Sequence, residues 1–272
     1  MRRLIVKRLC FLLFAAMLPL VLSTLSEAQV GRKSADMRGD LQLEVVTVPQ
    51  DIAAGFERLN SQVLLYHPVN SGSDERKKTE KSGNLKNYPL LIFLHGSGGS
   101  NGKIERFKWK GEVKRFAART KGDPLVSILV PQSKGHWDPG SLDKMLEYIL
   151  EKNPAIDPNR IYCIGYSMGG KGTWEWAMAS PGRFAAIIPK GFIPDLTDIR
   201  GMVDLPLWAM VGTKDSKPRV EGIQAMEKTL KELGSTGVKT TYFEGANHGS
   251  TPGEIKKLDG VYDWLFSHKL PR

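Results

Sequence analysis

The chain has very little cysteine, which excludes a fold held together by disulfide bonds. Its 272 residues contain two cysteines, and the first, Cys10, lies in an apolar stretch near the N-terminus. If that stretch is removed, only Cys163 remains and no internal disulfide can form. Cys163 is flanked by Ile161, Tyr162 and Ile164, a pattern that predicts a buried strand thiol and not a nucleophile. A chain of this length can be stable on its core alone.

The usual signatures of metal, nucleotide and nucleic-acid binding are also missing. The sequence has no His-Glu-x-x-His pattern for zinc, no Gly-x-Gly-x-x-Gly dinucleotide fingerprint and no Walker lysine pattern. We therefore expect a protein that works without a metal or cofactor and does not bind nucleic acid.

Only one hydrophobic run suggests targeting, and it lies at the N-terminus. Residues 1–8 are basic, residues 9–22 are almost wholly apolar, and Ser26-Glu-Ala28 offers small residues at the spacing of a cleavage site. The alternative is a membrane anchor, but the run is short for about 30 Å of hydrocarbon and contains Pro19. The sequence predicts a signal peptide over residues 1–28, a secreted or periplasmic protein, and no stable membrane insertion after cleavage.

Acidic residues are fewer than basic ones, and the formal net charge is +10. Such a surplus favours attraction to anionic surfaces or polymers. Part of it lies in the signal segment and in residues 74–81, where basic and acidic side chains are mixed as on a solvated face. The role of that basic loop is left open.

After the signal peptide, the pattern predicts a polar leader over residues 29–40 and a single domain over residues 41–272. Residues 41–48 and 61–69 have the β-branched and aromatic character of strands and are expected to form an antiparallel hairpin. Residues 71–87 are rich in Ser, Gly, Lys and Glu, which predicts an exposed loop.

From residue 89 onward, short apolar runs alternate with segments of helical period. This alternation predicts an α/β fold with a mainly parallel central sheet and helices on both faces. Ligands bind beyond the carboxyl ends of the strands in such sheets. The expected strands are 90–94, 125–130, 161–165, 185–189, 207–211 and 238–243, and the expected helices are 104–118, 141–152, 168–179, 220–233 and 253–266.

The strongest chemical signal is Gly165-Tyr-Ser-Met-Gly169, between a predicted strand and a predicted helix. A strand that enters a helix through Gly-x-Ser-x-Gly is a nucleophile elbow. The turn is so tight that the positions flanking the serine need glycine, and it holds the hydroxyl at the positive end of the next helix. Ser167 is therefore the predicted nucleophile.

A serine hydroxyl needs a base to take its proton and an acid to orient that base. Of the five histidines, His248 follows the last predicted strand, and Asp215 follows the strand before it. The order Ser167, Asp215, His248 is that of α/β-hydrolases and differs from the orders in chymotrypsin and subtilisin. Asp204 and Asp195 are alternative acids, but they lie on less suitable strand ends.

Two backbone N–H groups are expected to stabilise the oxyanion of an acyl-transfer reaction. We assign them to Met168, directly after the nucleophile, and to Ser97 in the glycine-rich stretch 94–100. His136 and Trp137 follow another strand end and are candidate pocket residues. Core packing is the alternative role for Trp137.

Three stretches carry a resemblance to a known group: Leu94-His-Gly-Ser-Gly-Gly99, residues 157–174 around the elbow, and Phe184-Ala-Ala-Ile-Ile-Pro189. They resemble the bacterial predicted-peptidase and esterase branch of the α/β-hydrolase superfamily, related to feruloyl esterases, polyhydroxybutyrate depolymerases and dienelactone hydrolases. The resemblance spans about residues 88–268 and implies a triad of the elbow serine, the acid after the next-to-last strand and the terminal histidine. The chain departs from this resemblance at Lys171, since an aromatic residue is common at that position in the group.

Together, these features predict an exported serine hydrolase that cleaves carboxylic esters through an acyl-enzyme intermediate. The short connection between the strands at 185–189 and 207–211 leaves no room for a large lid, and the open site would suit a small-molecule or polymer-linked ester, such as an acyl group on a polysaccharide. A serine peptidase resembling the catalytic domain of prolyl oligopeptidases is one alternative, and a non-catalytic binding module is another. The sequence does not indicate the oligomeric state.

Overall fold

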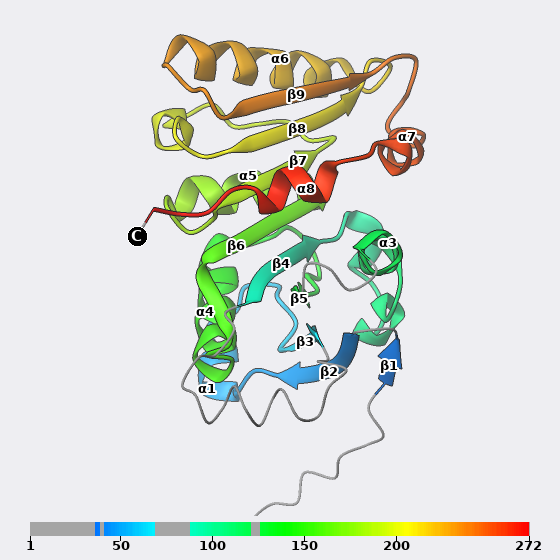
Figure 1. The fold of residues 1–272 in the computed structure, drawn as a ribbon, viewed down its shortest axis with the longest axis vertical. Helices are drawn as coiled ribbons and strands as arrows, with labels where there is room; N and C mark the ends of the chain where they lie inside the picture. The colour runs from blue at the N-terminus through cyan, green and yellow to red at the C-terminus, as the bar shows by residue number, and fades with distance from the viewer. Residues whose placement is uncertain (1–35, 39–40, 69–87, 121–125, 272) are drawn as a thin grey trace, which may run out of the picture. The chain divides into compact units, whose positions relative to one another are not determined.

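The fold is built on a nine-stranded sheet with the strand order β1-β2-β3-β5-β4-β6-β7-β8-β9 (Figure 1). The structure is a computed structural model that describes residues 36–38, 41–68, 88–120 and 126–271. The predicted signal peptide and the basic loop at 74–81 lie outside the described residues. All described strands and helices belong to one unit, Ala35–Arg272.

The first part of the sheet is antiparallel and the rest is parallel. β1 pairs with β2, β2 with β3, and β3 with β5 in antiparallel fashion, whereas the pairs from β5 across to β9 are all parallel. The predicted fold class is therefore confirmed. The strands are β1 (Asp36–Arg38), β2 (Leu41–Thr47), β3 (Gln62–Pro68), β4 (Tyr88–Leu94), β5 (Ser127–Val130), β6 (Ile156–Tyr166), β7 (Ala186–Lys190), β8 (Leu207–Gly212) and β9 (Val238–Phe243).

Two strands differ from expectation. β6 begins at Ile156, earlier than predicted, because this residue pairs with Tyr88 on β4 ahead of the apolar run. β1 lies within residues 29–40, the predicted polar leader. Its three residues, Asp-Met-Arg, have no alternating apolar pattern that could indicate a strand.

Helices cover both faces of the sheet, as predicted. On one face α4, α5 and α6 pack side chains such as Leu146, Trp176 and Met226 against the strands. On the other face α3, α7 and α8 contribute Phe116, Ile255 and others. The helices are α1 (Gln50–Ala53), α3 (Gly111–Thr120), α4 (Pro139–Lys152), α5 (Met168–Ala179), α6 (Lys217–Glu232), α7 (Thr251–Lys257) and α8 (Val261–Phe266), with 3₁₀ turns η1 (Ser97–Gly99), η2 (Ile104–Phe107) and η3 (Ile199–Met202).

Two of the predicted helices are each divided in two. The segment 104–118 splits into η2 and α3 because Trp109 and Gly111, the residue at which α3 begins, take left-handed φ angles of 55° and 57°, which do not occur in the interior of a right-handed helix. The segment 253–266 splits into α7 and α8 at Gly260, whose φ is 71°. Helical period alone did not reveal these breaks.

The connection between β7 and β8 contains only η3 and no further helix or strand. The prediction of a fold without a large lid domain is confirmed. Over the described part of the chain, none of the helices has the length and apolar character needed to cross a bilayer.

Candidate active site

The turn between β6 and α5 has the strained geometry of a nucleophile elbow. Ser167 has φ 58° and ψ −118°, a conformation that costs free energy for any residue with a side chain. A Cβ atom on Gly165 would lie 2.0 Å from the carbonyl oxygen of Gly169, and one on Gly169 would lie 2.0 Å from that of Leu94. Ser167 N donates a 2.8 Å hydrogen bond to the Lys190 carbonyl at the end of β7. Both glycines are therefore required by the close approach of backbone.

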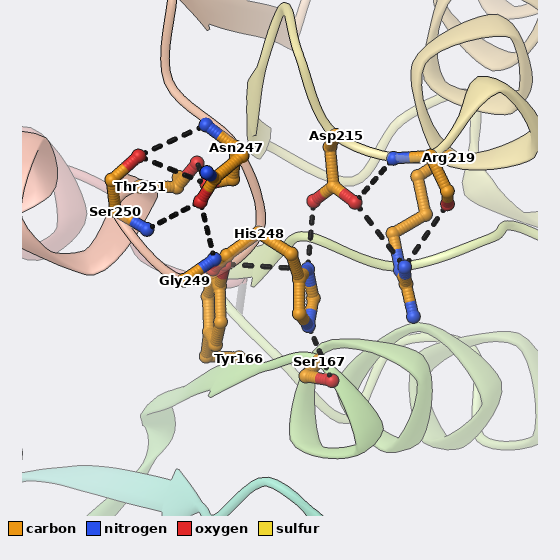
Figure 2. Close-up of polar contacts among 10 residues, drawn as sticks. Tyr166, Ser167, Asp215, Arg219, Asn247, His248, Gly249, Ser250 and Thr251 are labelled. Atoms are coloured by element: carbon orange, nitrogen blue, oxygen red, sulfur yellow. Dashed lines mark hydrogen bonds and ion pairs between the residues drawn. The ribbon is translucent and has the colours of Figure 1, made fainter.

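The structure brings Ser167, His248 and Asp215 together at the carboxyl ends of three parallel strands (Figure 2). His248 Nε2 lies 2.9 Å from Ser167 Oγ, and His248 Nδ1 lies 2.7 Å from Asp215 Oδ2. Because the carboxylate only accepts hydrogen bonds when ionised, Nδ1 carries the proton and Nε2 can accept one from the serine. This geometry can remove the hydroxyl proton as oxygen attacks an acyl carbon.

Asp215 is held as an anion by several donors. Its side chain is 0% exposed, and its Oδ1 accepts hydrogen bonds from Ser216 N at 2.6 Å and from Arg219 Nη1 at 3.2 Å. Burial alone would raise the pKa of Asp215, but the hydrogen bonds from His248 and Ser216 and the charge of Arg219 hold it below its usual value. Arg219 was not predicted, although its position one helical turn after the acid was visible in the sequence.

The loop that carries His248 is fixed by its own hydrogen bonds. Asn247 Oδ1 accepts from the backbone N–H groups of Gly249 and Ser250, both at 3.0 Å. Thr251 Oγ1 donates to the Asn247 carbonyl at 2.7 Å, which joins the loop to the start of α7. These contacts, drawn in Figure 2, restrict the backbone on both sides of the imidazole.

Tyr166 supports His248 from the other side, and the sequence reasoning missed it. Its hydroxyl donates a hydrogen bond to the His248 carbonyl, and its ring stacks on the imidazole with centroids 5.0 Å apart. Burial, together with the negative charge of Asp215, raises the pKa of Tyr166 to about 12, so it remains a donor at neutral pH. Gly191, with φ 56°, leaves room for the ring, since a Cβ there would lie 2.8 Å from Tyr166 Cε2.

The predicted oxyanion residues lie beside Ser167. Met168 is the first residue of α5, and the N–H groups of a first helical turn have no partner within the helix. Ser97 is exposed and begins η1, directly after Gly96. A Cβ on Gly96 would lie 3.7 Å from the Ser167 Cβ, so this loop runs beside the elbow.

His95 and Gln132 hold the glycine-rich loop in place. The His95 ring accepts from Ser133 N at 3.1 Å through Nε2, which leaves the proton on Nδ1, 2.8 Å from the Gly96 carbonyl. Burial, with a smaller effect of the Arg106 charge, lowers the pKa of His95. Gln132 Nε2 donates to the carbonyls of Gly99 and Gly102 at 3.0 and 3.1 Å. The loop is thus fixed by buried amide and imidazole groups.

The two candidate pocket residues lie in different environments. Trp137 is 2% exposed, and its indole N–H donates to the His95 carbonyl at 3.1 Å. It therefore belongs to the core and offers no face on which a substrate could stack, which corrects its assignment to the pocket. His136 is on the surface, where it lies 3.2 Å from Glu57 and has no hydrogen bond to Ser167, His248 or Asp215.

Two further side chains have structural explanations. Lys171 lies on the exposed side of α5, 3.3 Å from Glu175. Cys163 is fully buried, and burial raises the pKa of its thiol to about 12, which makes it unreactive. Among the described residues, no group of three His, Cys, Asp or Glu side chains is arranged to hold a metal ion.

The sheet topology and the relative placement of Ser167, His248 and Asp215 are similar to those of α/β-hydrolases. The model of the dienelactone hydrolase family matches residues 137–255. The matched range contains Ser167, Asp215 and His248. The match covers less than half of the chain.

Solved structures share the fold at low sequence identity. A thermostable esterase is 24% identical with a TM-score of 0.63, over 85% of this chain and 63% of its own. A ferulic acid esterase is 14% identical with a TM-score of 0.58, over 84% of this chain and 100% of its own. An acylaminoacyl peptidase of Pyrococcus horikoshii is 16% identical with a TM-score of 0.60, over 85% of this chain and 42% of its own. No curated protein matches the sequence significantly.

Proposed function

We propose that this chain is an exported serine esterase that cleaves carboxylic esters through an acyl-enzyme intermediate. The observation that carries the proposal is the continuous hydrogen-bond chain from Ser167 Oγ through the His248 imidazole to Asp215, with distances of 2.9 and 2.7 Å. The resemblance to esterases in fold and the dienelactone hydrolase match support the ester class.

In the proposed reaction, Ser167 Oγ attacks the ester carbonyl carbon while His248 Nε2 takes the hydroxyl proton. The backbone N–H groups of Met168 and Ser97 stabilise the negative oxygen of the tetrahedral intermediate. As the intermediate collapses, His248 gives the proton to the leaving alcohol. Water, deprotonated by His248, then attacks the acyl carbon, and His248 returns that proton to Ser167 Oγ as the acid leaves. Asp215 holds the imidazole tautomer and stabilises its cationic form.

The open site supports an ester with a bulky alcohol, such as an acyl group on a polysaccharide. The β7–β8 connection holds only η3, so this connection supplies no lid domain over the substrate. An open approach restricts a large alcohol less than a closed cavity would.

A fluorophosphonate probe tests the nucleophile directly. We expect the wild-type protein to be labelled at Ser167, and Ser167→Ala to lose labelling and on the order of 10⁶ in kcat for a p-nitrophenyl ester. Ser235→Ala, which changes a serine just after α6, is the matched control and should keep both. Labelling elsewhere, or ester turnover by Ser167→Ala, would contradict the proposal.

The peptidase alternative is separated by a substrate panel. The same protein is assayed with p-nitrophenyl esters and with proline and acylated-peptide anilides under identical conditions. We expect turnover of the esters to exceed that of the amides by far more than the difference in their intrinsic reactivity. A preference for amides would favour a peptidase, and binding of an ester without turnover would favour a non-catalytic module.

Export is tested by expression of the full chain in a bacterial host with a secretion pathway. The proposal expects a mature protein outside the cytoplasm that begins at Gln29, as read by N-terminal sequencing. An unprocessed N-terminus in the cytoplasmic fraction would refute it.

A further inference from the structure

Four neighbouring cations of one segment lack acidic partners in the part of the chain that the structure describes. Most exposed lysines on the helices lie beside a carboxylate. Within the described residues, by contrast, Lys103, Arg106, Lys108 and Lys110 form no ion pair. The paired lysines are Lys152 with Glu151, Lys171 with Glu175, Lys217 with Glu221, Lys228 with Glu232, Lys231 with Glu227 and Lys257 with Glu254.

Acidic residues near these four cations do not neutralise them. Residues 103–110, which we call the cationic segment, contain four basic residues and one acidic residue, Glu105. The next acid, Glu112, is already bound by Lys190 at 3.0 Å and by Arg115 at 3.0 Å. The segment therefore presents a local excess of positive charge, with Lys103, Arg106 and Lys110 exposed to solvent.

The cationic segment lies against the loop that borders the nucleophile. The Phe107 ring stacks on the His95 ring with centroids 5.1 Å apart and planes 10° apart. The Arg106 guanidinium lies 5.7 Å from the centre of the Phe107 ring. Ser100, just ahead of the segment, has its hydroxyl 4.0 Å from the sulfur of Met168, the residue after the nucleophile. The positive charge is thus anchored beside the proposed oxyanion loop.

We propose that the cationic segment attracts and binds carboxylate groups of the substrate, so that the preferred esters are those carried by acidic molecules. This inference rests on the proposed function and specifies the substrate class of the same site. Cations beside an open cleft raise the local concentration of anions and the rate of encounter. Because the charges are exposed, salt should weaken the effect, since the screening length falls from about 30 Å at 0.01 M to about 3 Å at 1 M salt.

The test compares matched anionic and neutral esters. One arm uses mono-p-nitrophenyl succinate against p-nitrophenyl butyrate, and the other uses acetylated polygalacturonate against acetylated xylan. The variant Lys103→Gln/Arg106→Gln/Lys110→Gln removes three charges from the segment. The control Lys152→Gln/Lys228→Gln/Lys231→Gln removes the same number from α4 and α6. Binding of polygalacturonate to Ser167→Ala protein is measured separately by fluorescence anisotropy.

We expect kcat/KM to favour the anionic ester about tenfold at low salt, and this preference to disappear in the segment variant but not in the control. Activity on the neutral esters should persist in both, which separates failure of this inference from failure of the proposed function. An effect on succinate alone points to small acidic esters, and an effect on the polymer alone points to polyanionic chains. Equal losses in both variants, no preference for anions, or a preference that salt leaves unchanged would overturn the inference.

Discussion

At the scale of single residues, the main finding beyond the three predicted side chains is the support given to His248 by Tyr166. The tyrosine occupies the variable position of Gly-x-Ser-x-Gly, so the motif gives no indication of its role. Its hydroxyl donates to the His248 carbonyl and its ring stacks on the imidazole. In the proposed mechanism, Tyr166 is thus a positioning residue that acts through His248.

The variant Tyr166→Phe tests this role, because it removes the hydroxyl and keeps the ring. A hydrogen bond contributes about 1 kcal/mol net, so we expect kcat to fall about fivefold with KM nearly unchanged. Tyr166→Leu, which removes stacking as well, should lose more. The measurement is steady-state kinetics beside thermal unfolding. Equal losses of kcat in the two variants, or a change in KM without a change in kcat, would argue against a role through the imidazole.

That Ser167, Asp215 and His248 lie close together could be predicted because each follows a predicted strand, and the carboxyl ends of parallel strands meet at one edge of the sheet. The pocket residues could not be predicted in the same way. Trp137 also follows a strand, but whether an indole faces solvent or the core depends on packing. Here Gly172 on α5 makes room for it, since a Cβ on that glycine would lie 2.6 Å from the Trp137 side chain.

At the scale of elements, a buried ionic cluster joins α3, β7 and α8 behind the elbow. Lys190, at the end of β7 and 4% exposed, lies 3.0 Å from Glu112 on α3. Glu112 also accepts from Tyr262 on α8 at 3.1 Å. Burial would raise the pKa of Glu112, but the charges of Lys190 and Arg115 hold it below its usual value. The Lys190 carbonyl in turn accepts from Ser167 N.

We expect Glu112→Gln to destabilise the fold by about 3 kcal/mol, because it leaves the buried Lys190 ammonium without a counter-charge. The free energy of unfolding from urea titration measures the loss. In Glu112→Gln/Lys190→Met the uncompensated lysine is absent, so the double variant should be more stable than the single one. If the double variant is the less stable, the cluster is not held by charge pairing.

Periodicity predicted that helices occur around residues 104–118 and 253–266, but not that each is interrupted. The interruptions depend on positive φ angles at Trp109, Gly111 and Gly260. A glycine is compatible with such an angle without requiring it, and a tryptophan in the sequence does not indicate a positive φ angle. Element type is thus a local property of the pattern, whereas the boundaries depend on tertiary packing.

At the scale of the whole molecule, several carboxylates have a pKa held below its usual value, which links stability to pH. For Asp215, Asp157 and Glu227, burial would raise the pKa, but hydrogen bonds and nearby cations lower it overall. Asp157 accepts from Asn159 N and is paired with Arg160 and Lys269, which ties β6 to the C-terminal segment.

A carboxylate with a depressed pKa in the folded state stabilises the fold above its unfolded pKa, and that stability is lost as pH falls through the folded value. The unfolded values are 3.8 for Asp and 4.5 for Glu. We therefore expect the Tm from calorimetry to decline slightly below about pH 6.5, because the lowered pKa of His95 makes the folded state bind fewer protons than the unfolded chain, and to fall steeply below about pH 4. Asp157→Asn should lower the Tm at pH 7 and flatten this acid decline, because the variant has no proton to take up at that site. A decline of the same steepness in the variant would show that Asp157 is not one of the linked groups, and a Tm that rises on acidification would contradict the sign of all three shifts.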